Sequence, residues 1–485
     1  MRLCTSSPST RSPAGPVGRF VPALRFVVAE RCPPHRHAGH AETSPCKPRT
    51  PKQPTGVKAR HDPEWRVDVL PHLQEPAPIW AVTPALTALI VIQVPASAAY
   101  VTIQVAAPEV ARTTGLPVEF VGVFTALSYL GAIAGGALTL SLLRRLGAFR
   151  ACQVAVIGCA LALAATTLAT VWALIVGALL LGLAHAPVTP LGSHVLAART
   201  PPAIRGLVFS IKQAAVPLGG VLAGVLVTAV VVASDWQSAV WVMASLCVLT
   251  ALLVMPLRAH LDDLEDAPKA SRTSPWREMC GSIRCVVEHG PILTLVFVGC
   301  AFGAAQWCFT AFYVAFVAED RGLPLVTAGV GFAIGQAAGV AGRIFWGAVA
   351  DRSGRPIRLL VGLGIAMAGG LTLLTLTDAA WPKAVTLALA ALVGVTAIGW
   401  NGVLIAEVAR RSPSGQVAAV AGGFVAFFAV STIAFPLAFA AVALLVGYAA
   451  GFIAIALLCL YASWRLYRQV PEADDDRADD DCADA

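Results

Sequence analysis

Residues 342–358 read GRIFWGAVADRSGRPIR, and this stretch decides the fold because it runs from an apolar segment into a short cluster of charges. Residues 135–150 read GGALTLSLLRRLGAFR, and they align with it when Gly147 is set against Gly354, at an offset of about 207 residues. Near the same offset, VLAARTPPAIRG is followed by a counterpart in AEVARRSPSGQ. The chain is therefore predicted to contain two copies of one structural unit.

The composition indicates the environment in which these copies fold. Of the 485 residues, 57% are hydrophobic and only 13% are charged, and the mean hydropathy is +0.73. An ordinary soluble domain carries about 25% charged residues. This shortage of charge excludes a soluble globular protein, and the spread of apolar residues along the chain excludes a disordered polymer. The prediction is an all-α membrane protein that crosses the bilayer many times.

Twelve apolar segments divide the chain, each near the roughly 20 residues that a membrane-spanning helix needs. A charged and polar stretch separates the sixth segment from the seventh, which predicts two pseudo-symmetric bundles of six helices. The expected spans are 79–105, 119–143, 151–170, 172–197, 206–232, 237–257, 291–317, 325–350, 357–377, 383–406, 416–445 and 447–464. The predicted divisions are a disordered tail or misassigned start at 1–78, an N-terminal bundle at 79–257, a cytoplasmic central loop at 258–290, a C-terminal bundle at 291–465 and an acidic cytoplasmic tail at 466–485.

Basic residues gather in alternate connections between the apolar segments, at 144–150, 199–205, 258–284, 352–358 and 410–411. The positive-inside rule places these connections, and with them both termini, in the cytoplasm. This placement accounts for the net charge of +7 without a nucleic-acid partner, so the expected partners of a monomeric chain are a small solute and the bilayer. Among the 35 basic residues, 29 Arg against 6 Lys indicate a GC-rich bacterial genome and hence a bacterial inner membrane.

The charged end of 342–358 resembles the loop motif of the major facilitator superfamily, G-x-x-x-D-R-x-G-R-K/R, which joins the second helix to the third or the eighth to the ninth. The second-half copy supplies Asp351, Arg352, Gly354 and Arg355, whereas Arg144 replaces the acid in the first-half copy. The resemblance implies a gate, in which the acid caps a helix end and an arginine bonds a neighbouring helix. Such a gate locks one face of the transporter, and the loss of the acid at Arg144 should weaken the lock in the first half.

The resemblance also implies a site for substrate, because facilitator transporters bind it at the midplane with their first, fourth, seventh and tenth helices lining the cavity. A polar side chain at the bilayer centre is costly unless it faces a cavity or a partner. The candidate binding residues in those spans are Gln93, His185, Gln306, Trp307 and Asn401. An interhelical hydrogen bond is the alternative for each amide, and a satisfied core position is the alternative for His185.

Two cations lie well inside the expected spans, and no Asp or Glu does. Lys212 in the fifth span and Arg343 in the eighth lie about two turns in from the same side. Two embedded cations suit a carboxylate, since both form charge-assisted hydrogen bonds with it, and the alternative is that they snorkel to the surface. The segment AGRIFWG is similar to the eighth helix of oxalate:formate antiporters and monocarboxylate transporters, which implies that Arg343 takes the substrate carboxylate.

These features predict a secondary active transporter of a small organic solute, most simply a carboxylate anion, which works by alternating access with proton symport or anion exchange. The alternative is a multidrug or other small-molecule efflux antiporter, although VPLGGVLAG departs from the G-P-x-x-G-G spacing of that branch. An enzyme is not expected, because G-x-S-x-G and H-E-x-x-H motifs are absent from the sequence, and a non-transporting receptor would carry a soluble domain. No cofactor or metal is expected, because the 12 cysteines lack metal-ligand spacing.

The predicted orientation can be tested by thiol labelling. Single cysteines placed at 144–150, 258–290 or 351–358 in a cysteine-free variant should not react with an impermeant reagent added to intact cells, because these connections are expected in the cytoplasm. The same cysteines should react once the cells are permeabilised. Reaction in intact cells would reverse the orientation.

Overall fold

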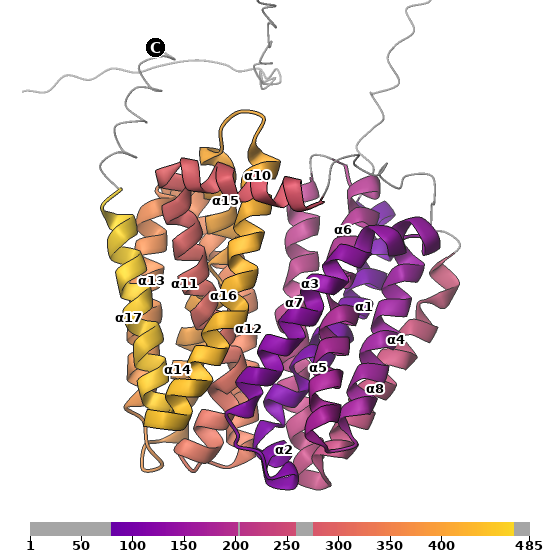
Figure 1. Cartoon of the computed structure of the whole chain (residues 1–485), viewed down its shortest axis with the longest axis vertical. Coiled ribbons are helices and arrows are strands. Elements are labelled where there is room, and N and C mark those ends of the chain that lie inside the picture. Colours follow the sequence, from indigo (N-terminus) through magenta and orange to yellow (C-terminus); the bar gives the residue numbers. More distant parts are fainter. Residues whose placement is uncertain (1–78, 202–203, 259–274, 470–485) are drawn as a thin grey trace, which may run out of the picture. The chain divides into compact units, whose positions relative to one another are not determined.

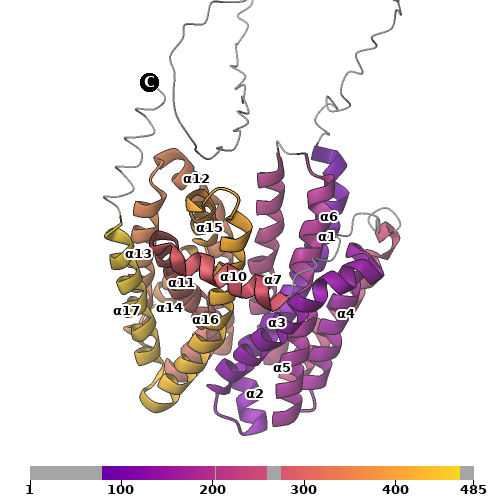
Figure 2. The same ribbon diagram turned by 45° about the horizontal axis from the view of Figure 1, so that its top comes forward.

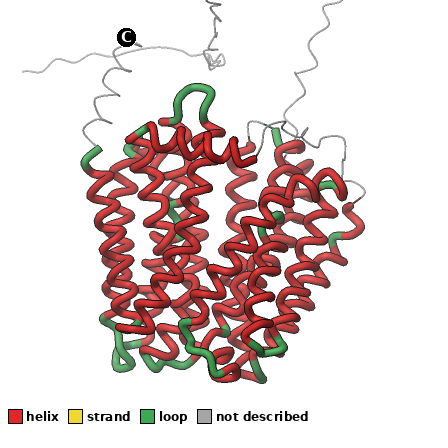
Figure 3. The backbone as a smooth tube through the Cα atoms, viewed as in Figure 1, coloured by secondary structure: helices red, strands yellow, loops and turns green. Residues whose placement is uncertain are grey.

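The computed structural model describes residues 79–201, 204–258 and 275–469, and within these ranges the chain forms helices and no strand (Figure 3). The predictions for 1–78 and for 470–485 lie outside the described residues. The helices (Figure 1) are α1 (Ile79–Val105), α2 (Ala107–Thr114), α3 (Phe120–Leu146), α4 (Ala148–Thr166), α5 (Val171–His185), α6 (Val188–Arg199), α7 (Arg205–Ala233), α8 (Trp236–Leu253), η2 (Met255–Leu257), α10 (Pro275–Glu288), α11 (Gly290–Ala315), η3 (Phe316–Asp320), α12 (Leu325–Ser353), α13 (Pro356–Thr375), α14 (Lys383–Ala397), α15 (Asn401–Arg411), α16 (Val417–Val446) and α17 (Tyr448–Tyr467).

Twelve stretches of these helices are long and apolar enough to cross a membrane, which confirms the expected number of spans. The main difference from the prediction lies at the basic ends. The helix α3 continues to Leu146, α12 to Ser353 and α15 to Arg411, each past its predicted limit. Arginines expected in loops therefore occupy the last helical turn, where a cation interacts favourably with the partial negative charge of a helix C-terminus.

The internal repeat is visible in the backbone as well as in the sequence. Gly147 ends α3 and Gly354 ends α12, both with positive φ, and each donates its N–H to the carbonyl four residues back. Gly115 after α2 and Gly322 after η3 also have positive φ, and they too are separated by 207 positions. A glycine adopts this conformation without the strain that a Cβ would cause. Equivalent turns therefore recur at one offset in the two halves.

Two spans are each split into two α-helices. The fourth span, Val171–Arg199, is split into α5 and α6 at Ala186 and Pro187, and the tenth, Lys383–Arg411, is split into α14 and α15 at 398–400. Proline explains the first break because it has no N–H to donate. The second break contains Gly399, where a Cβ would lie 2.3 Å from the Val395 carbonyl oxygen, so only glycine fits.

The central connection, predicted as a loop, contains the helix α10, which packs against α16 (Figure 2). The Cys285 thiol donates to Oε1 of Gln416 at 2.9 Å, and the backbone of Ser282 lies where a Cβ on Gly423 would be, at 2.5 Å. The described part of this connection is therefore attached to the C-terminal half. Its residues 259–274 lie outside the described ranges.

The two halves, α1–α8 and α11–α17, approach each other near the α2 end of the spans (Figures 1 and 2). A Cβ on Gly122 of α3 would lie 2.7 Å from the Pro436 carbonyl oxygen of α16, and one on Gly224 of α7 would lie 2.8 Å from the Gly329 carbonyl oxygen of α12. Toward the α10 end, a Cβ on Gly206 of α7 would meet nothing within 4 Å. The tightest glycine contacts between the halves are thus on the α2 side.

Neighbouring glycines of α3 offer a matched test of this packing. A Cβ on Gly135 would lie 2.3 Å from the Leu183 carbonyl oxygen of α5, whereas one on Gly136 would meet nothing within 4 Å. We expect Gly135→Ala to destabilise the purified protein by about 1–3 kcal/mol through overpacking, and Gly136→Ala to be neutral or slightly stabilising. Thermal unfolding in detergent measures both. Equal effects of the two substitutions would contradict the packing of α3 on α5.

Candidate substrate-binding site

The two broken spans occupy corresponding places, as the fourth span of each half. A break inside a spanning segment leaves backbone groups without their helical partners, and such breaks in matching positions mark binding sites in transporters. His185 is the last residue of α5, and Asn401 is the first residue of α15. Two of the predicted binding residues therefore flank the breaks.

In the C-terminal half, the structure brings three predicted residues together at the break of the tenth span. Arg343 of α12 donates from Nε to the Ile398 carbonyl oxygen at 3.2 Å. Asn401 donates from Nδ2 to the same oxygen at 3.3 Å and to Oε1 of Gln306 on α11 at 3.0 Å. The three residues form one network, which we call the Arg343 network, and it satisfies a carbonyl that the helix break leaves free.

Arg343 also reaches the other half of the protein. Its Nη1 donates to the Gln213 carbonyl oxygen of α7 at 3.1 Å. This carbonyl would normally accept from the residue four positions later, but that residue is Pro217, which has no N–H. The proline thus frees an acceptor that a cation on the opposite half occupies. Among the described residues, the Nη2 group of Arg343 has no hydrogen-bond partner.

In the N-terminal half, Lys212 and Gln93 meet at α6, directly after the break of the fourth span. The Lys212 ammonium donates to the Thr189 carbonyl oxygen at 2.5 Å and to the Ser193 hydroxyl at 3.0 Å, and its residue is only 1% exposed. The Thr189 hydroxyl donates to Oε1 of Gln93, which itself donates to Ser97 at 3.0 Å. Lys212 is thus a buried cation held by its own half, rather than one that snorkels to the surface.

His185 and Trp307 lie in one aromatic cluster that spans both halves. The His185 ring is 4.6 Å from that of Tyr100 on α1, and the Trp307 ring of α11 is 4.9 Å from that of Tyr129 on α3, measured between centroids. The Tyr100 and Trp307 rings are 6.4 Å apart. Within the described part of the chain, no hydrogen bond or ring contact joins His185 or Trp307 to Arg343, but Trp307 directly follows Gln306 along α11.

The residues predicted to form the gate lie at the α10 end of the spans. The cap of α12 is Gly354, whose N–H bonds the Ala350 carbonyl, and not Asp351 as expected, because a carboxylate at a helix C-terminus has no N–H to offer. Within the described residues Asp351 is exposed and makes no ion pair. Arg144 lies in the last turn of α3.

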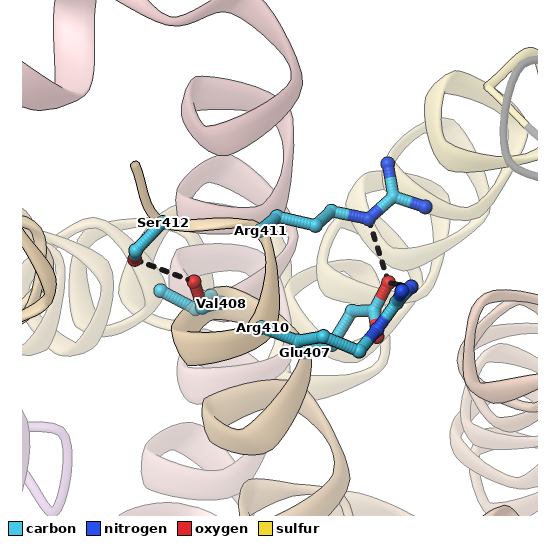
Figure 4. A network of polar contacts seen from close by, with 5 residues as sticks. All are labelled: Glu407, Val408, Arg410, Arg411 and Ser412. Atoms are coloured by element: carbon cyan, nitrogen blue, oxygen red, sulfur yellow. Dashed lines mark hydrogen bonds and ion pairs between the residues drawn. The ribbon is translucent and has the colours of Figure 1, made fainter. Parts of the chain in front are cut away.

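One buried acid occupies the same end of the tenth span (Figure 4). Glu407 is 2% exposed and accepts from Arg410 at 2.7 and 2.8 Å and from Arg411 at 2.6 Å. Its charge is therefore compensated on its own helix. The embedded cations Lys212 and Arg343 have no such acidic partner within the described residues.

Some members of these networks were not identified from the sequence. The free Gln213 carbonyl could have been predicted from the sequence, because Pro217 is four residues later in the same span and has no N–H to donate to it. Tyr100 and Tyr129 had none, because a tyrosine in an apolar segment reads equally well as a core residue or as a residue of the membrane interface.

Comparisons with known proteins agree with this architecture. The family model of the Major Facilitator Superfamily matches residues 89–436. No curated protein matches the chain significantly. Among solved structures, a POT family transporter in complex with 5-aminolevulinic acid has a TM-score of 0.65 at 11% identity, covering 80% of this chain and 96% of that one. The nucleoside transporter NupG has a TM-score of 0.66 at 12% identity, covering 79% and 99%.

A bacterial homologue of the lysosomal transporter Spinster, in an inward-facing and unoccupied conformation, has a TM-score of 0.62 at 14% identity, covering 80% of this chain and 97% of that one. At such identities these likenesses concern the fold alone, whereas the family match covers most of the chain. The chain therefore belongs to the major facilitator superfamily and is a multi-pass membrane transporter of small solutes rather than an enzyme.

Proposed function

We propose that the protein transports a small carboxylate anion by alternating access, and that Arg343 is the residue that binds the carboxylate. One observation carries this proposal. The Arg343 guanidinium bonds groups of both halves, while its Nη2 has no hydrogen-bond partner and the guanidinium has no acidic partner among the described residues. A guanidinium meets a carboxylate through two parallel charge-assisted hydrogen bonds, which are stronger than bonds to neutral carbonyls.

The partners that Arg343 has in this structure suggest how binding is coupled to movement. Its bond to the Gln213 oxygen holds α12 of one half to α7 of the other. A carboxylate that binds the guanidinium competes with the Gln213 oxygen for its N–H groups. This competition breaks the hydrogen bond between the halves. The substrate thereby alters the free-energy difference between conformations, which is what a coupled transporter requires.

The other candidate residues have supporting roles in this proposal. Gln306 and Asn401 fix the tenth span beside Arg343, and Gln93 and Lys212 fix the fourth span in the opposite half. Lys212 adds positive potential to the site, since its ammonium is buried and no carboxylate of the described residues neutralises it. His185 and Trp307 belong to the aromatic cluster that joins the two halves.

We further propose that this structure is open toward the α10 side, that this side faces the cytoplasm of a bacterial inner membrane, and that the gate works in the opposite state. The tightest glycine contacts between the halves are on the α2 side, and Asp351 is exposed at the α10 side. When the α10 ends of the halves approach each other, Asp351 gains a partner among the arginines of the two motif copies, which are Arg144, Arg352 and Arg355.

Replacing the guanidinium of Arg343 by an ammonium group tests whether this residue binds the carboxylate. Arg343→Lys keeps the charge but loses the paired geometry, so the affinity for a carboxylate such as propanoate should fall about tenfold to a hundredfold, the equivalent of 1.5–3 kcal/mol for a charge-assisted bond. Equilibrium binding to the purified protein measures the change. Arg145→Lys, at an exposed position of α3, is the matched control. Unchanged binding at normal expression would reject the assignment, and transport of neutral drugs by that variant would favour the efflux alternative.

The role of Pro217 can be tested separately. Pro217→Ala restores an N–H for the Gln213 carbonyl, so the contribution of Arg343 to this contact should disappear. Arg343→Gln should therefore cost less stability in the Pro217→Ala background than in the wild-type protein. The double variant should be more stable than the two single effects together predict, by about 0.5–1.5 kcal/mol. Pro436→Ala, inside α16, should combine additively with Arg343→Gln. Additivity in both pairs would mean that Arg343 gains nothing from the carbonyl that Pro217 frees.

A further inference from the structure

Four aromatic side chains from four different spans meet between the halves, and we call them the aromatic cluster: Tyr100 of α1, Tyr129 of α3, His185 of α5 and Trp307 of α11. Their ring centroids are 4.6 to 6.4 Å apart. The two tyrosines pack edge-on against the Trp307 ring, at interplanar angles of 71° and 77°. Three members belong to the N-terminal half, and Trp307 alone belongs to the C-terminal half.

The cluster contains polar atoms that the protein does not satisfy. Oη of Tyr100, Nε2 of His185 and Nε1 of Trp307 are buried and have no hydrogen-bond partner among the described residues. Tyr100 is only 4% exposed, so water has little access to its hydroxyl from outside. Each unsatisfied polar group of this kind costs about 1–3 kcal/mol. Three such groups in one cluster make it a candidate position for a polar ligand.

The donor and acceptor character of the three atoms limits which ligands could bind there. The Trp307 N–H can only donate, and the Tyr100 hydroxyl can donate as well as accept. The hydroxyl of Tyr129, by contrast, is not among the buried atoms that lack a partner. The ligand is therefore expected to carry at least one hydrogen-bond acceptor, placed at the edge of a group that contacts aromatic rings.

The cluster is next to the Arg343 network. Gln306 and Trp307 are consecutive on α11, so their side chains point in different directions from one stretch of helix. Gln306 accepts from Asn401, which shares the Ile398 oxygen with Arg343, while Trp307 contacts the tyrosines. The cation and the aromatic rings are thus connected through neighbouring positions of one helix.

Aromatic rings also bind cations, and this alternative has to be weighed. The described spans contain Lys212 and Arg343 as embedded charges, and the single buried acid, Glu407, is compensated by two arginines. A cation in the cluster would be repelled by this potential. The charges therefore favour a ligand in which an aromatic ring is attached to an anionic group.

Building on the proposed function, we propose that the aromatic cluster is a second subsite and that the substrate class is aromatic carboxylates, with the carboxylate at Arg343 and the planar ring at Trp307. Ring centroids 4.9 Å apart leave no room for a further ring between Trp307 and Tyr129. Trp307 has to move away from the N-terminal cluster when the ring enters. Substrate binding therefore acts on the contact between the halves at this subsite as well.

Matched ligands test the subsite in the full chain reconstituted in lipid. Benzoate and cyclohexanecarboxylate have the same charge and similar size, but only benzoate is planar and aromatic. The wild-type protein should bind benzoate about twofold to tenfold more tightly, the gain expected of an aromatic pair. Trp307→Leu should remove this preference, so that within this variant benzoate and cyclohexanecarboxylate bind with equal affinity. Trp172→Leu, at a position that is 76% exposed, should preserve it.

The unsatisfied atoms need a separate comparison. An acceptor on the ring, as in 4-hydroxybenzoate, should improve affinity in the wild-type protein, and Trp307→Phe or Tyr100→Phe should each lower that gain by roughly fivefold for one lost hydrogen bond. Tyr100→Phe should not lower the melting temperature of the ligand-free protein, because its hydroxyl has no protein partner. Failure of both variants to change the 4-hydroxybenzoate gain would overturn the hydrogen-bonding role.

The outcomes separate this inference from the proposed function. If propanoate, benzoate and cyclohexanecarboxylate bind equally well and all depend on Arg343, the carboxylate function stands and the aromatic subsite is rejected. If no carboxylate binds, the proposed function itself fails. If benzylamine binds as tightly as benzoate, the cluster is a cation site and the assignment to aromatic carboxylates is wrong.

Discussion

Every backbone carbonyl inside a bilayer needs a donor, and this requirement governs the arrangement of the polar residues in the protein. Ordinary spans meet it within one helix. The break of the tenth span and the proline in α7 create acceptors that their own helices cannot satisfy, at Ile398 and Gln213. A single guanidinium, that of Arg343, donates to both. The position of this cation therefore follows from backbone chemistry and not from a neighbouring acid.

The N-terminal half solves a related problem with a different cation. Lys212 donates to the Thr189 carbonyl just after the break of the fourth span, and Gln93 accepts from the Thr189 hydroxyl. Each half thus combines a broken fourth span with a glutamine from its first span and an embedded cation. The cations come from spans that are not equivalent in the repeat, since Lys212 is in the fifth span of its half and Arg343 in the second. The duplication fixes the scaffold, whereas the polar contacts have diverged.

The sequence predicts the fold well because membrane insertion depends on local properties, namely length, hydropathy and the position of basic residues. The twelve spans and the repeated turns at Gly147 and Gly354 follow from these. The site is predicted only residue by residue. Gln306 and Asn401 stand out as polar residues in apolar segments, but their bond joins positions 95 residues apart, which no local pattern encodes. The helix α10 was missed because it lies in a polar connection.

The contacts of Arg343 and Trp307 have one physical consequence in common. Both side chains belong to the C-terminal half, and both touch the N-terminal half through groups that a ligand can replace: a neutral carbonyl for Arg343 and aromatic edges for Trp307. Contacts of this kind are each worth about 1 kcal/mol, so they hold the halves together without fixing them. A ligand that takes the place of both contacts breaks weak interactions between the halves and forms stronger interactions with Arg343 and Trp307. Its binding energy is thereby directed at the same interface that has to open and close.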